Sequence, residues 1–74
     1  MLTKPQIDRV MRKLGYRATY DNGRRKIWST NQPPCPGAAN HLDVRYPIQR
    51  SDLERVLIDK GIIAGPAELD SLLG

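Results

Sequence analysis

The sequence is poor in the residues from which small proteins build metal sites, disulfide frameworks and aromatic cores. Its 74 residues include one cysteine, one histidine and no phenylalanine, and aromatic residues make up only 5% of the chain. A zinc site needs three or four Cys or His ligands, so one chain cannot assemble such a site, and the single Cys35 cannot form an internal disulfide. No apolar run approaches the roughly 20 residues of a membrane span, and no signal-peptide stretch opens the chain. We therefore expect a cytoplasmic protein without a metal, a cofactor or a membrane partner.

The length limits the chain to one small domain, residues 1–74. A domain of this size buries only about 60% of the surface of its unfolded chain, so its stability is marginal. A deep, enclosed active site is hard to build on such a core. The length therefore excludes a multidomain enzyme and favours a function that is carried by the surface.

Charge is unevenly distributed along the chain. Twelve Lys and Arg against eight Asp and Glu give a net charge of +4; residues 1–50 carry +7 and residues 51–74 carry −3. Eight of the twelve basic residues are arginine, whose planar guanidinium recognises phosphate or carboxylate better than an ammonium does. The pattern favours an anionic partner, either a nucleic acid or an acidic protein surface, although +4 is also an ordinary solubilising charge.

The first helix has clear boundary signals. Thr3 and Gln6 match the T-x-x-Q capping box, Pro5 stands in the first turn, and Gly15 follows the last apolar residue of the pattern. The spacing predicts an amphipathic helix over about 4–14.

Two further helices are expected in the last third of the chain. Ser51-x-x-Glu54 matches a second capping box and predicts a helix that stops at Gly61. A Gly-Pro pair then predicts a short C-terminal helix over 65–74, which would cover one end of the core.

The pair Asn22-Gly23, between two β-prone stretches, is a strong hairpin signal. A two-residue loop at this pair would align Tyr20 with Arg25 and Ala18 with Ile27, which gathers apolar residues on one face. The opposite face of the hairpin would then carry Arg17, Thr19, Arg24, Lys26, Trp28 and Thr30.

A third strand follows a proline-rich surface loop over 31–40. Residues 41–46 alternate between apolar and polar side chains, which is typical of a half-buried strand. The order α-β-β-β-α plus a short helix predicts an α+β fold, with a three-stranded antiparallel sheet and the helices packed on one face. The open sheet face would display Arg17, Lys26, Trp28, His41, Asp43 and Arg45.

This order resembles the double-stranded-RNA-binding-domain-like fold and, within it, the HicA family of small toxin ribonucleases. The resemblance runs from about Leu2 to Ile63 and is carried by Leu14-Gly15-Tyr16, Gly23-Arg24-Arg25-Lys26-Ile27-Trp28 and the Ser51 helix with its ending Lys60-Gly61-Ile62. The family usually has Gly-Ser-His where this chain has Gly23, Arg24 and Arg25, so the catalytic histidine is missing. The resemblance therefore implies the fold and an RNA-binding relative, and not the ribonuclease activity.

Two binding functions are compatible with these residues. The favoured one is a small basic module for RNA or single-stranded nucleic acid, in which the hairpin arginines and Lys26 contact phosphates and Trp28 stacks on a base. The alternative is a protein–protein interaction module, such as a phage-type inhibitor (anti-defence protein) that docks on a host nucleic-acid-handling complex. A plainer interpretation packs Trp28 under the proline-rich loop and leaves the hairpin tip to solvent.

A third function is a HicA-like ribonuclease, for which His41 near Asp43 and Arg45 is the one catalytic candidate. The chain has no second histidine and no nucleophile motif, so we lean towards a protein that is not an enzyme. The candidate binding residues are Arg17, Arg24, Arg25, Lys26, Trp28, His41 and Arg45.

Overall fold

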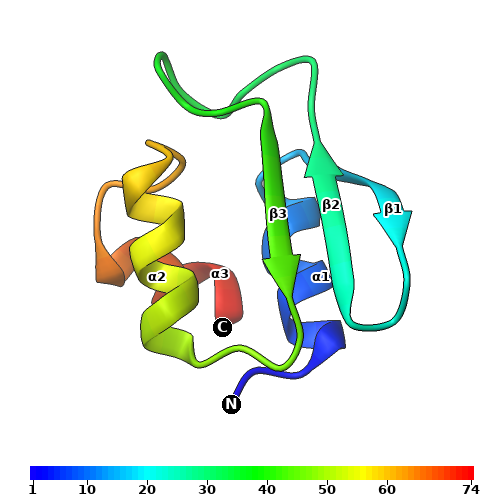
Figure 1. The fold of residues 1–74 in the computed structure, drawn as a ribbon. Coiled ribbons are helices and arrows are strands. Elements are labelled where there is room, and N and C mark those ends of the chain that lie inside the picture. The colour runs from blue at the N-terminus through cyan, green and yellow to red at the C-terminus, as the bar shows by residue number, and fades with distance from the viewer.

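The computed structural model describes residues 1–74 and places the elements in the order α-β-β-β-α-α. These are α1 (Lys4–Lys13), β1 (Arg17–Asp21), β2 (Arg25–Ser29), β3 (His41–Arg45), α2 (Arg50–Asp59) and α3 (Pro66–Leu73). The strands form an antiparallel sheet in the order β1-β2-β3. In Figure 1, α1 passes behind the sheet and α2 lies beside β3, while the near face of the sheet is uncovered. The predicted α+β class and element order are confirmed.

The N-terminal boundary of α1 is the predicted capping box. The Gln6 N–H donates to Thr3 Oγ1 at 3.3 Å, and the Thr3 N–H donates to Gln6 Oε1 at 2.8 Å. The inward side chains of the helix, Ile7 and Val10 among them, are fully buried. The chain leaves the helix through Gly15, whose φ of +92° is a conformation that side chains other than glycine rarely adopt.

The start of α2 differs from the prediction. Its N-cap residue is Gln49, which makes no side-chain cap hydrogen bond, and Ser51 lies within the first turn. The Leu2 N–H donates to Ile48 O at 3.0 Å, which fixes an extended backbone just before Gln49. The capping box predicted from Ser51 and Glu54 is therefore wrong, because this tertiary contact places the N-cap two residues before the local sequence signal.

The hairpin turn is also shifted from its predicted position. The Asn22 N–H donates to Arg25 O at 3.1 Å, so the two loop residues are Gly23 and Arg24. Asn22 Oδ1 accepts the N–H groups of Arg24 and Arg25, at 3.0 and 2.8 Å. These side-chain hydrogen bonds stabilise a turn one residue later, so that Asp21 pairs with Lys26 instead of Arg24.

The pairing of β1 with β2 changes again near Thr19. Tyr20 pairs with Ile27, whereas Ala18 pairs with Trp28, because the register shifts between the two β1 residues. The extra residue is typical of a β-bulge, which also makes an edge strand a poor template for another chain. The predicted pairing of Ala18 with Ile27 is therefore wrong.

The two faces of β2 are the reverse of the predicted ones. Trp28 is fully buried and Lys26 is only 8% exposed, whereas Ile27 is half-buried on the other face. Trp28 pairs with Leu42, so the largest side chain of the protein joins the apolar face of β3. The placement of Lys26 and Trp28 on the open face is wrong, because an indole buries more apolar area than an isoleucine side chain.

Lys26 is held inside by two carboxylates and a ring. Its Nζ lies 2.9 Å from Asp8 Oδ1 and 3.7 Å from Asp21 Oδ2, and 4.9 Å from the centre of the Trp28 ring. A buried ammonium group is stable only when nearby carboxylates or an aromatic ring compensate for its lost hydration. The fully or nearly fully buried core consists of Ile7, Val10, Met11, Tyr16, Trp28, Leu42, Val44, Leu53, Leu57, Ile62, Ile63 and Leu69.

The predicted proline-rich loop, residues 31–40, has no helix or strand and packs against the end of α2. The Ala39 N–H donates to Lys60 O at 2.9 Å, and Cys35 Sγ lies 3.0 Å from Gly61 O. Gly61 has a φ of +69°, and a Cβ at this position would come within 3.0 Å of Gly37 O. The loop is therefore attached to the helix layer and does not cover the open sheet face.

Candidate nucleic-acid interface

Eight side chains form three rows across the uncovered face of the sheet, which we call the open face. The rows follow from the residues that are paired directly across the strands: Arg17, Ser29 and His41; Tyr20, Ile27 and Asp43; and Arg25 and Arg45. In Figure 1 no helix lies in front of the near face of the sheet. The rows bring together polar and charged groups that are far apart in the sequence.

Ser29 and His41 are close neighbours within the first row. The Thr30 N–H donates to Asn40 O at 2.9 Å, so the next pair along the ladder, Ser29 with His41, is a pair without mutual hydrogen bonds. The Cβ atoms of such a pair lie about 4.5–5.5 Å apart. The serine hydroxyl and the imidazole can therefore contact the same ligand.

Arg25 is held in position by two neighbours on the open face. Its Nε lies 2.9 Å from Asp43 Oδ2, and its guanidinium carbon lies 5.9 Å from the centre of the Tyr20 ring. Both side chains of the ion pair are about 40% exposed, so the pair contributes less than about 1 kcal/mol to stability. Its main effect is to keep a guanidinium beside an exposed aromatic ring.

Most of the positive charge near the open face has no acidic partner. Arg17, Arg45 and Arg24 at the hairpin turn make no ion pair within the protein. The three arginines of the open face against Asp43 leave a formal charge of +2 there. These free guanidinium groups are suited to phosphate oxygens.

Tyr20 is the exposed aromatic residue of the sheet, with 48% of its surface accessible. The predicted register places Trp28 on the open face and Tyr20 on the apolar face of the hairpin, whereas in the structure Trp28 is buried and Tyr20 lies on the open face. The strict alternation around Leu42 was the sequence signal for the correct faces. It places Leu42 on the buried face, and since Trp28 pairs with Leu42, Trp28 is buried while Ile27 and its partner Tyr20 lie on the open face.

The predicted binding residues are therefore partly brought together. Arg17, Arg25, His41 and Arg45 lie on the open face, Arg24 lies at the adjoining turn, and Lys26 and Trp28 lie inside the protein. His41 is exposed, and the only carboxylate on its face, Asp43, is paired with Arg25. His41, the one predicted catalytic residue, therefore has no free carboxylate beside it to assist acid–base catalysis.

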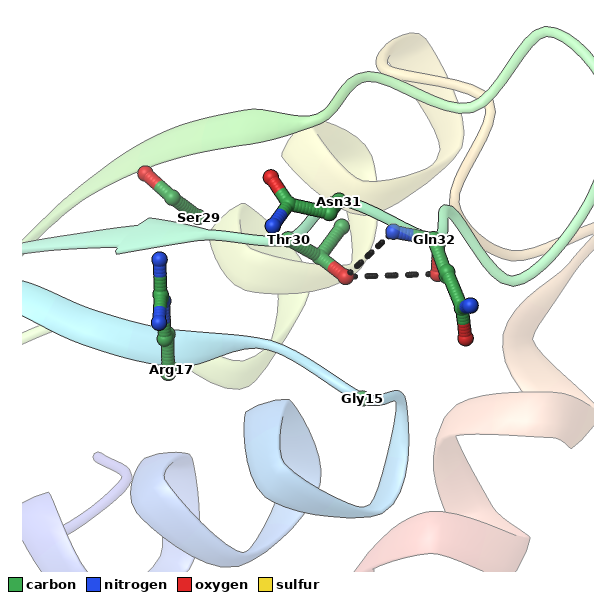
Figure 2. Close-up of a pocket in the computed structure, with 6 residues that line it drawn as sticks. All are labelled: Gly15, Arg17, Ser29, Thr30, Asn31 and Gln32. Atoms are coloured by element: carbon green, nitrogen blue, oxygen red, sulfur yellow. Dashed lines mark hydrogen bonds between the residues drawn. The ribbon is translucent and has the colours of Figure 1, made fainter.

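A polar groove of about 320 Å³ lies at the end of the first row, and no sequence pattern indicated it. Figure 2 shows its lining between the α1–β1 turn and the start of the proline-rich loop: Gly15, Arg17, Ser29, Thr30, Asn31 and Gln32. Thr30 Oγ1 accepts the Gln32 N–H at 3.1 Å and donates to Gln32 O at 3.2 Å, which holds this wall of the groove.

Two titratable groups near the buried Lys26 are perturbed. The pKa of Asp21 is lowered, first because Gly23 N–H donates to its Oδ1 at 2.8 Å and then because Lys26 and Lys4 are near. Burial, together with the nearby Asp8 and Asp21 carboxylates, raises the pKa of Tyr46 to about 12. Neither group is among the eight side chains of the open face.

The structure holds no group of three or more His, Cys, Asp or Glu side chains that could bind a metal ion. None of its three helices has the length and apolar character that crossing a membrane requires. No protein-family model, curated protein or solved structure matches this chain, so the resemblance to the HicA family stays a prediction.

Proposed function

We propose that this protein is a cytoplasmic binding module for single-stranded nucleic acid, and that RNA is its preferred ligand. The observation that carries the proposal is the exposed Tyr20 ring beside Arg25 on an uncovered sheet that also displays Arg17 and Arg45. Proteins that bind single strands combine such aromatic platforms with guanidinium or ammonium groups that follow the backbone.

Different side chains of the open face bind different parts of the nucleic acid. Stacking of a base on Tyr20 contributes about 1–3 kcal/mol in proteins of this kind. Arg17 and Arg45 supply charge for phosphates on either side of the ring. Ser29 and His41 offer hydrogen bonds to a ribose 2′-hydroxyl, which is the group that distinguishes RNA from DNA.

Fluorescence anisotropy with a labelled oligouridylate and the matching DNA tests this proposal. Tyr20→Ala should weaken RNA binding by about tenfold or more, because the stacking platform is lost. Tyr20→Phe should retain most of the affinity, because the ring remains. Arg9→Gln is the matched charge control, since Arg9 is exposed on α1, which lies behind the sheet in Figure 1.

The outcome that contradicts the proposal is an absence of binding at low salt, or binding that Tyr20→Ala and Arg9→Gln weaken equally. Either result would favour the alternative expected from the sequence, a protein–protein interaction module that uses the same exposed arginines.

A further inference from the structure

We infer that the polar groove beside Arg17 is a phosphate-binding subsite. It would hold one phosphoryl group, with its attached sugar, at the end of the row Arg17, Ser29 and His41. The inference extends the proposed function, because it names the part of the ligand that the groove takes.

The groove exists because β1 and β2 separate at one end of the sheet. Their pairing ends with Arg17 opposite Ser29. Before Arg17 the chain turns away into α1 through Gly15, whereas after Ser29 it continues along β3, where the Thr30 N–H donates to Asn40 O. The edge of the chain that follows Ser29 therefore has no β1 partner, and the space beside it stays open (Figure 2).

The lining offers hydrogen-bond donors that the protein does not use. Arg17 has no ion pair, and the Ser29 hydroxyl and the Asn31 side chain make no hydrogen bond. The Asn31 backbone N–H is also without an acceptor. In Figure 2 the side chains of Arg17, Ser29 and Asn31 extend to the same side of the chain segments that line the groove.

The chemistry of the lining selects an anion. None of the six lining residues is acidic or hydrophobic, and one carries a positive charge. Pockets for apolar ligands are lined mostly by hydrophobic and aromatic side chains, so this lining excludes a lipid chain as the occupant. A guanidinium with neutral hydroxyl and amide donors matches the oxygens of a phosphate.

The volume and position of the groove connect it with the open face. About 320 Å³ is more than one phosphate fills and leaves room for its sugar and water. Arg17 belongs both to the groove and to the open face, next to Ser29. A strand stacked on Tyr20 can therefore place a neighbouring phosphate in the groove.

Amide chemical shifts of the isotope-labelled protein test the inference, in a buffer free of phosphate. Three probes separate the possible sources: inorganic phosphate, a short 5′-phosphorylated oligouridylate, and the same oligonucleotide with a 5′-hydroxyl. We expect Gly15, Asn31 and Gln32 to shift with all three. Arg17→Gln should weaken binding of inorganic phosphate about tenfold, while Arg9→Gln should leave it nearly unchanged.

The outcomes distinguish this inference from the proposed function. If the oligonucleotides shift Tyr20 and Ile27 but leave the groove amides in place, the phosphate subsite is wrong and the proposed function stands. If inorganic phosphate shifts the groove in an Arg17-dependent way but no oligonucleotide binds, the subsite stands and the proposed function is wrong. If the 5′-phosphorylated oligonucleotide binds more tightly than the 5′-hydroxyl one, the subsite holds the phosphate at the end of a strand. If the two bind equally, the subsite holds an internal phosphate.

Discussion

Trp28 and Tyr20 stand on opposite faces of one sheet, and their exposure decides which of them can stack on a base. Trp28 is fully buried against β3 and the helices, whereas nearly half of Tyr20 is accessible. Titration with nucleic acid should therefore leave Trp28 without the direct quenching that a stacked base causes.

The first prediction concerns the stability that Trp28 contributes. Trp28→Ala should lower the free energy of unfolding by about 3–5 kcal/mol, because it removes the largest core side chain and leaves a cavity. Urea unfolding followed by circular dichroism measures the change. A loss below about 1 kcal/mol would mean that Trp28 is not in the core.

The second prediction concerns the ionisation of Tyr46, whose hydroxyl is buried. Its pKa is about 12 in the folded protein and 10.0 in the unfolded chain. The unfolded chain therefore loses this proton first, so stability should fall as the pH rises from 10 to about 12. In Tyr46→Phe this part of the fall should be absent, and the difference between the two proteins in urea unfolding at each pH measures it. Parallel stability curves over this range would contradict the assignment.

At the scale of elements, α2 begins without the side-chain cap that its sequence indicated. The backbone of Gln49 is already extended, with φ −74° and ψ 148°, which is the conformation of an N-cap residue. Gln49 therefore lacks only a side-chain oxygen that is close enough to accept an N–H of the first turn.

The third prediction follows from this boundary. Gln49→Ser should raise the free energy of unfolding by about 0.5–1 kcal/mol, because the hydroxyl can accept an N–H of the first turn. Ser51→Ala is the matched control and should change stability by less than about 0.5 kcal/mol, because Ser51 lies inside the helix. Thermal unfolding of both variants decides the matter: if Ser51→Ala is the costly change, the helix starts where the local signal indicated.

The elements were predictable wherever a local signal agreed with the packing. Thr3 with Gln6, and the Gly-Pro pair before α3, marked helix starts that the structure confirms, and the alternation of residues 41–46 marked β3. Asn22 misled because its side chain, as well as its backbone, builds the turn. No pattern within β2 alone could decide between Ile27 and Trp28 for the core, because that choice depends on Leu42 in β3 and on Asp8 in α1.

The candidate site was predictable in part for the same reason. The alternation of β3 correctly assigned His41 and Arg45 to the open face. Arg25 was among the predicted binding residues, but the predicted register placed it on the apolar face of the hairpin. The same register placed Tyr20 on that face, so Tyr20 was not predicted as a binding residue. The polar groove forms where β1 and β2 separate, and the spacing of residues along the sequence does not predict this point.

At the scale of the whole molecule, the sheet is rich in positive charge, whereas α2 and α3 are rich in negative charge. The sheet carries the three arginines of the open face. The helices α2 and α3 contain two basic residues, Arg50 and Arg55, against five acidic ones: Asp52, Glu54, Asp59, Glu68 and Asp70. Arg50 itself is paired with Asp70, which ties α2 to α3. The open face therefore keeps a positive charge that favours the approach of an anion, and α1 adds Lys4, Arg9, Arg12 and Lys13 against Asp8 on the other side of the sheet.

The fourth prediction is the salt dependence of RNA binding, which tests the central proposal most directly. Three phosphate contacts from Arg17, Arg25 and Arg45 should give a slope of about −2 in a plot of log affinity against log salt between ~50 and ~200 mM. Replacing all three by glutamine should bring the slope close to zero and leave only weak binding, while Arg9→Gln should keep the original slope. RNA binding whose slope is the same in the triple variant as in the original protein would contradict the open face as the nucleic-acid interface.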